Sequence, residues 1–271
     1  MNTLLHSTRF QQCYYTKTGA GPYVMLLHGF GESSAIFKHQ AAFLQQYYTV
    51  LLPDLPGTGR SALSPEEMTM ELLADFVHEI LIQEEAKETI LLGHSMGGYA
   101  ALAFAEKYEY QLLAFGLLHS TAYADDELKK ENRRKSVKLI NNGGKVVFLN
   151  AMIPNLYSDL SKHEHPEEVQ YHLTIAHKIT SESLVAYTNA MICRKEMTPV
   201  LKNNLLPVLF VIGKDDNVVP FRDMLLQSTL PGRSSVALFE NVGHSSMLEC
   251  PEKVNDVLNN FCKYVLQNKI A

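Results

Sequence analysis

The residues most able to do chemistry lie in the sequence GHSMGG at positions 93–98, which contains the pattern G-x-S-x-G. An apolar run at 89–92 precedes it, and a stretch with helical periodicity at 97–108 follows it. This context predicts a tight turn between a strand and a helix that exposes the hydroxyl of Ser95. The dipole and free N–H groups of the helix would then face the reaction centre. We therefore predict that Ser95 is a nucleophile.

A serine hydroxyl needs a neighbouring base, and the chain offers 11 histidines. His244 follows the last predicted strand and precedes the C-terminal helix, so it should emerge at the same edge of the sheet as Ser95. His94 adjoins the serine, but the turn should send its side chain elsewhere. His119 ends a strand and could line the pocket. Four others have spacings that match no metal motif well: His163, His165, His172 and His177. We expect His244 to be the base.

The third member of a triad would be an acid after the apolar run at 207–212. Both Asp215 and Asp216 stand there. The order serine, aspartate, histidine along the chain is one of the three known for such triads. From the residues alone, either carboxylate could orient His244.

A second glycine-flanked turn, HGFG at 28–31, follows the apolar run at 23–27. Such a turn can aim a backbone N–H at the space above Ser95. The N–H groups of Phe30 and Met96 would then form an oxyanion hole. We expect the His28 side chain to be an ordinary hydrogen-bonded structural residue, because the backbone is the part that should act.

Strand-like and helix-like segments alternate along most of the chain. Residues 5–15 predict an edge hairpin or meander. Short apolar runs typical of buried parallel strands lie at 23–27, 48–52, 89–92, 112–118, 207–212 and 235–239. Helical stretches are clearest at 68–85, 97–108 and 252–266. This alternation predicts an α/β fold, with a mostly parallel sheet covered by helices on both faces.

Residues 120–199 break the alternation, since they contain no convincing strand and show helical periodicity. A structureless loop of that length is uncommon in a compact domain. We predict a helical lid inserted into a core formed by 1–119 and 200–271. Apolar or adaptable lid side chains would wall a substrate pocket above Ser95, or would pack inside the lid instead: Met152, Ile153, Leu156, Tyr157, Tyr187 and Met191.

The run DDELKKENRRK at 125–135 could be an anion-binding patch at the lid entrance. Mixed charges at helical spacing are more typical of a solvated helix face with pairs four residues apart, which is what we expect.

Composition narrows the function classes. The chain has 271 residues, 46% of them hydrophobic, and a formal net charge of −5. No basic stripe predicts a nucleic-acid partner, and no apolar run reaches the roughly 18–20 residues that span a bilayer. The N-terminus lacks the apolar core of a secretory signal, and the four cysteines form no C-x-x-C pair. We expect a cytoplasmic protein with free thiols and no metal or cofactor; its oligomeric state stays open.

Almost the whole chain resembles the α/β-hydrolase superfamily, in its lidded single-domain branch. The turn at 28–31, the loop DLPGTGRS at 54–61, the motif at 93–97 and the pair at 243–244 are each similar to a family motif. Residues 186–194 are similar to lid endings in enol-lactonase-like and simple esterase members. The family's acid motif commonly runs G-x-x-D with a proline four residues later, which selects Asp216 through Gly213 and Pro220. Serine at the nucleophile position argues against haloalkane dehalogenases and epoxide hydrolases.

The resemblance implies hydrolysis of a small carboxylic ester or lactone through an acyl-enzyme. In it Ser95 attacks, His244 shuttles the proton and Asp216 orients the imidazole. Carbon–carbon bond hydrolysis or a lyase reaction on the same triad is an alternative. A ligand-binding, receptor-like protein with marginal turnover is an alternative of another class.

Overall fold

The computed structural model describes residues 2–268 and is built around one eight-stranded sheet. Its strand order is β1-β2-β4-β3-β5-β6-β7-β8, parallel from β4 to β8 and antiparallel where β2 meets β1 and β4. The predicted α/β class is confirmed. The strands are β1 (Asn2–Leu4), β2 (Tyr14–Thr18), β3 (Tyr23–Leu27), β4 (Thr49–Pro53), β5 (Thr89–His94), β6 (Leu112–Leu118), β7 (Val208–Gly213) and β8 (Ser234–Phe239).

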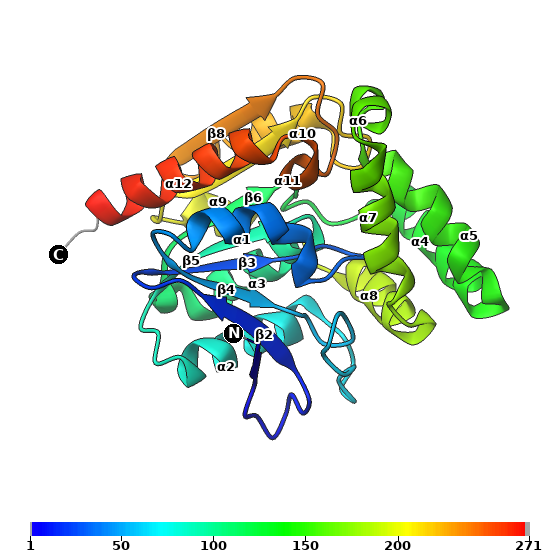
Figure 1. Cartoon of the computed structure of the whole chain (residues 1–271), viewed down its shortest axis with the longest axis horizontal. Helices are drawn as coiled ribbons and strands as arrows, with labels where there is room; N and C mark the ends of the chain where they lie inside the picture. Colours follow the sequence, from blue (N-terminus) through cyan, green and yellow to red (C-terminus); the bar gives the residue numbers. More distant parts are fainter. Residues whose placement is uncertain (1, 269–271) are drawn as a thin grey trace.

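Helices cover both faces of the sheet because buried strand residues alternate between them. On β7, Phe210 faces the cluster shared with α2 (Met70–Gln83) and α3 (Met96–Tyr108). Its neighbour Val211 faces the cluster shared with α1 (Lys38–Leu44), α11 (Ser246–Glu249) and α12 (Pro251–Gln267). Figure 1 shows α1 and α12 on one side of the strands. The shorter elements are η1 (Ser34–Phe37), η2 (Glu109–Gln111), α9 (Thr198–Asn203) and α10 (Phe221–Gln227).

The N-terminal segment differs from the predicted hairpin at 5–15. Strands β1 and β2 do pair, but β1 ends at Leu4 and β2 begins only at Tyr14. The connection between them buries Phe10, whose ring lies 5.1 Å from that of Phe76 on α2. Burial of this connection in the core therefore replaces strand pairing over most of the segment.

Five helices lie between β6 and α9, with two short helical turns, η3 (Ile140–Gly144) and η4 (Ile153–Leu156). We call them the helical insertion: α4 (Glu127–Leu139), α5 (Lys145–Met152), α6 (Asp159–Glu164), α7 (Pro166–His177) and α8 (Ser181–Cys193). Figure 1 shows them gathered at one end of the molecule. That residues 120–199 act as a separate lid stays a proposal. Within residues 2–268, no helix has both the length and the apolar character needed to cross a bilayer.

Buried polar side chains of the helical insertion and of the core lie close to one another. His172 Nε2 on α7 lies 3.6 Å from Glu32 Oε1, which follows β3, and both side chains are buried. On its other side, His172 Nδ1 lies 3.1 Å from the hydroxyl of Tyr157. Burial lowers the pKa of His172 to about 4, although the Glu32 carboxylate opposes this shift. His172 is therefore a neutral imidazole at pH 7.

This neutral histidine predicts a loss of stability in acid. In the unfolded chain His172 takes up a proton below pH ~6.5, whereas in the folded chain it does so only near pH 4. The neutral His172 therefore contributes fully to the free energy of unfolding above pH ~6.5, and this contribution is lost as the pH falls towards 4. Lowering the pH from 7.5 to 5 should reduce the free energy of unfolding by up to about 2 kcal/mol more in the wild type than in His172→Gln. Urea unfolding at both pH values measures this.

His163→Gln is the control, since His163 is exposed on α6 of the same insertion. It should keep the wild-type pH dependence. An equal pH dependence in the wild type and His172→Gln would contradict the prediction.

Candidate active site

Ser95 occupies a strained turn between β5 and α3, with φ 49° and ψ −116°. Such backbone angles are costly for a residue with a side chain and are concentrated at functional sites. A Cβ on Gly93 would lie 2.2 Å from the carbonyl oxygen of Gly97, so the turn can close only with glycine there. The Ser95 N–H donates to the carbonyl of Leu118 on β6 at 2.8 Å. The turn leaves Ser95 half-buried between buried neighbours.

A cavity of about 240 Å³ lies over this turn, between the sheet edge and the helical insertion. Ser95 and His244 both line it, together with Phe30 and Glu32 from the turn after β3. The remaining wall comes largely from α4, α5, η4 and α8. Two residues distant in sequence, Ser95 and His244, therefore share one small chamber.

His244 is hydrogen-bonded to Asp216. Its Nδ1 lies 2.7 Å from Asp216 Oδ2, while Oδ1 accepts the N–H groups of Val218 and Val219 at 2.8 and 2.9 Å. Burial alone would raise the pKa of the Asp216 carboxyl, but His244 and His119 hold it well below its usual range. An ionised Asp216 keeps the proton on Nδ1 and leaves Nε2 of His244 as the acceptor.

The neighbouring Asp215 is exposed. Its N–H donates to the carbonyl of Val242, which fixes this backbone with Asp216 directed inward. The structure thus brings Asp216 to His244 and leaves Asp215 on the surface.

The turn at 28–31 passes directly against Ser95. A Cβ on Gly29 would lie 3.2 Å from the Cβ of Ser95, so a side chain at this position would crowd the turn. The Gly29 N–H donates to Glu32 Oε2 at 2.6 Å. No hydrogen bond within residues 2–268 uses the N–H of Phe30 or Met96. Both N–H groups are therefore free to bind an oxygen, which is the requirement of the predicted oxyanion hole.

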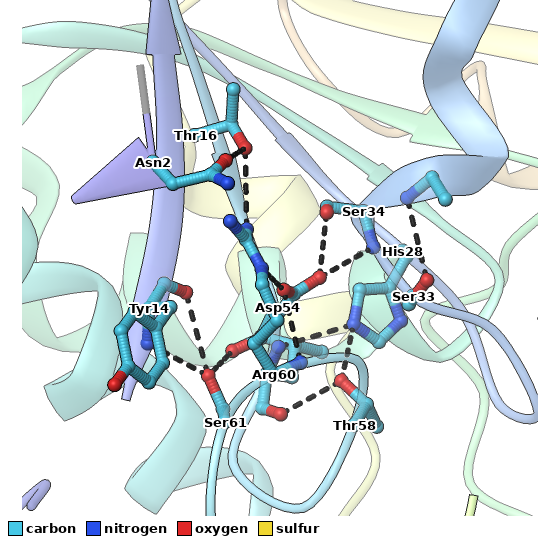
Figure 2. A network of polar contacts seen from close by, with 12 residues as sticks. Asn2, Tyr14, Thr16, His28, Ser33, Ser34, Asp54, Thr58, Arg60 and Ser61 are labelled. Carbon is cyan, nitrogen blue, oxygen red and sulfur yellow. Dashed lines mark hydrogen bonds and ion pairs between the residues drawn. The ribbon is translucent and has the colours of Figure 1, made fainter. Parts of the chain in front are cut away.

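His28 supports this turn from behind. It is fully buried, its Nε2 accepts the N–H of Leu55 at 3.1 Å, and burial lowers its pKa. In the loop after β4, Asp54 accepts hydrogen bonds from the Ser34 hydroxyl at 2.6 Å and from Arg60 Nε at 2.7 Å (Figure 2). The His28–Leu55 and Ser34–Asp54 bonds tie the loop after β4 to the segment after β3, which is consistent with a structural role for His28.

His94 and Glu32 form a buried ion pair that the sequence analysis did not anticipate. His94 Nδ1 lies 3.0 Å from Glu32 Oε2, and its Nε2 lies 2.8 Å from the carbonyl oxygen of His244. Both partners are acceptors, so both ring nitrogens must carry protons. Burial alone would lower the pKa of His94, but Glu32 raises it above its ordinary value. Burial alone would raise the pKa of Glu32, but the charge on His94 lowers it to about 2.

Glu249 is a second residue that the sequence analysis missed. Its buried carboxylate accepts the N–H groups of Gly243, Ser245 and Ser158, each at about 3.0 Å. It thereby fixes the backbone on both sides of His244. Only its position five residues after His244 could have suggested this role, and that spacing is not specific.

His119 lies behind Asp216 and does not line the cavity. Its Nδ1 is 3.3 Å from Asp216 Oδ2 without a hydrogen bond, and its Nε2 is 2.7 Å from the Ser246 hydroxyl. His119, Asp216 and His244 are the one set in residues 2–268 whose ligand atoms, all within 4.8 Å of one another, could hold a metal ion. The same Asp216 oxygen is also hydrogen-bonded to Nδ1 of His244.

Three of the six predicted pocket residues line the cavity: Met152, Leu156 and Met191. The other three are absent from the cavity lining and are packed elsewhere. Ile153 lies in the apolar cluster on the α1 side of the sheet. Tyr157 contacts His172, and the Tyr187 hydroxyl donates to the carbonyl of Pro56 at 2.7 Å. These three are corrected from pocket to packing residues.

Comparison with known proteins finds hydrolases of similar fold and sequence. A thermophilic esterase from Thermogutta terrifontis, solved with malate bound, is 28% identical, with a TM-score of 0.91 and 98% of each chain covered. An enol-lactonase from Burkholderia xenovorans LB400 shares the fold at 16% identity and a TM-score of 0.86, over 94% of this chain and 99% of that one. A putative carbamate hydrolase, RutD, from Pantoea ananatis is 27% identical over 87% of this chain and 86% of its own length.

The model of the alpha/beta hydrolase family matches residues 24–257, which include every element described above around Ser95, Asp216 and His244. The chain belongs to the α/β-hydrolase family.

Proposed function

We propose that this protein is a serine hydrolase that cleaves a small carboxylic ester or lactone through an acyl-enzyme intermediate. One observation carries the proposal: a strained Ser95 lines the same cavity as His244, and the ring of His244 is hydrogen-bonded to the buried carboxylate of Asp216. The family and the named hydrolases among the relatives support a hydrolase. A cavity of about 240 Å³ is below the usual size of drug-binding pockets, which favours a small substrate.

In the proposed reaction, Ser95 Oγ attacks the carbonyl carbon while His244 Nε2 takes the hydroxyl proton. The carbonyl electrons move to its oxygen, which the N–H groups of Phe30 and Met96 stabilise. When this intermediate collapses, the C–O bond to the leaving alcohol breaks and His244 returns the proton to that oxygen. Water then attacks the acyl-enzyme with His244 as base, which releases the acid and restores Ser95.

We predict that a fluorophosphonate probe labels Ser95, because the strained turn exposes its hydroxyl beside a base. Intact-mass and peptide mass spectrometry locate the adduct, and a panel of acetyl to octanoyl esters and lactones gives turnover. Ser95→Ala should show neither labelling nor turnover. Labelling at another residue would refute the assignment, and tight ligand binding without turnover would favour the receptor-like alternative.

We predict that Asp216→Asn lowers kcat by roughly 10⁴-fold, because an amide favours the wrong imidazole tautomer. Asp215→Asn is the matched control: the same change at an exposed neighbour should have little effect. Steady-state kinetics on one ester ranks the two variants. The opposite ranking would show that Asp215 is the functional acid.

The helical insertion should select acyl length through its cavity-lining side chains. Met152→Ala enlarges the cavity and should raise the octanoyl-to-acetyl ratio of kcat/KM by an amount equivalent to about 1–3 kcal/mol. Ile153→Ala is the control, since Ile153 is buried outside the cavity; it should cost about 2–5 kcal/mol of stability and leave the ratio unchanged. Equal shifts of the ratio in both variants would contradict a selective wall.

A further inference from the structure

The inner face of α4 brings polar groups to the cavity. Asn132, Arg133 and Ser136 line the same chamber as Ser95, together with apolar side chains of α5 and α8. The surrounding helix largely fits the expected solvated face, on which the pair Arg134–Glu131 is exposed. Arg133 departs from it, because its side chain is only 25% exposed and turns toward the buried Asp125.

Asp125 holds two guanidinium groups at once. Its Oδ2 lies 2.5 Å from Arg133 Nε, and its Oδ1 lies 2.9 Å from Arg194 Nη2. Burial alone would raise the pKa of Asp125, but Arg194 and Arg133 hold it below its usual value. One ionised carboxylate therefore faces two permanent positive charges, so the cluster keeps a net charge of +1.

Of the two arginines, Arg133 lines the cavity and Arg194 does not. Arg194 is 6% exposed and directs its terminal nitrogens at Asp125 and at the carbonyls of Met191 and Tyr123. By contrast, Arg133 bonds only through Nε, and within residues 2–268 neither of its terminal nitrogens has a hydrogen-bond partner. An arginine held by Nε presents a fixed pair of N–H donors that suits a carboxylate.

No acidic group in the chamber cancels this charge. Glu32 is the one acidic side chain among the described residues that line the cavity, and the protonated His94 neutralises it. Asp216 lies outside the lining and faces His244 and His119. The wall that faces the substrate is therefore positive at Arg133.

We propose that Arg133 binds a carboxylate of the substrate, so that the preferred substrates are anionic esters or lactones, such as half-esters of short dicarboxylic acids. This inference rests on the proposed ester or lactone hydrolysis and names its substrate class. The cavity volume of about 240 Å³ limits the acid to a chain of few carbons. The apolar wall of Met152 and Leu156 would then contact the methylene groups between the two ends.

The kinetic test compares ethyl hydrogen glutarate with ethyl pentanoate, which has the same acyl length but no charge, by proton release in a pH-stat. The ratio of kcat/KM for the charged to the neutral ester should favour the charged ester in the wild type. In Arg133→Gln this ratio should fall about 10- to 100-fold. Arg133→Lys should give an intermediate value, because it keeps the charge and loses the paired donors.

Arg134→Gln is the matched control, since Arg134 lies next on the same helix, is 47% exposed and does not line the cavity. Its ratio should change by less than about twofold. An unchanged ratio in Arg133→Gln, or an equal fall in Arg134→Gln, would overturn the inference while leaving ester hydrolysis in place.

A binding experiment separates the two proposals. Calorimetric titration of Ser95→Ala with glutarate needs no turnover, and adding Arg133→Gln should weaken the binding by about 10- to 100-fold. If no ester or lactone is hydrolysed, the proposed function fails, and Arg133-dependent glutarate binding would still support the carboxylate site. Glutarate binding that is absent, or unaffected by Arg133→Gln, would overturn it.

Discussion

The buried ion pair between Glu32 and His94 holds the parts of the site together. Each side chain is about 1% exposed, so neither charge could be there without the other. Glu32 fixes the turn beside Ser95 through the N–H of Gly29, and His94 holds the loop of His244 through its carbonyl. Three loops from different strands, after β3, β5 and β8, are thus locked to one another by a single pair of charges. The turn after β3, Ser95 and His244 are thereby held in fixed relative positions.

The parts of the fold set by local pattern could be predicted from the sequence. The strands at 23–27 and 112–118 agree residue for residue, because buried parallel strands are continuously apolar. The turn at Ser95 was predictable for a steric reason, since its flanking glycines are places where a side chain would collide. The choice of Asp216 over Asp215 came from a family register that the structure matches in geometry.

Other features depend on which face of an element turns inward, and a single sequence does not determine that. Met152 and Ile153 are adjacent and similar in hydrophobicity, yet one lines the cavity and the other packs against the sheet. In the sequence, Arg133 is one of several charged residues in the run at 125–135. What distinguishes it is its contact with Asp125, which also binds Arg194, and both of these residues lie outside α4. His94 and Glu32 are separated by 62 residues in the chain, so no local motif links them.

The position of the helical insertion has a consequence for how the chain can vary. On β6, Phe115 pairs with Val208 on β7, so all the intervening chain closes a single long loop between two neighbouring strands. The entropy of closing a loop grows only with the logarithm of its length, at about 0.6 kcal/mol for each doubling. Helices can therefore be added, removed or exchanged there while the sheet keeps its register. The same connection makes the β6–β7 pairing strongly non-local, which slows folding. Changes in this connection can therefore alter substrate specificity at little cost in stability, and the accompanying cost is slower folding.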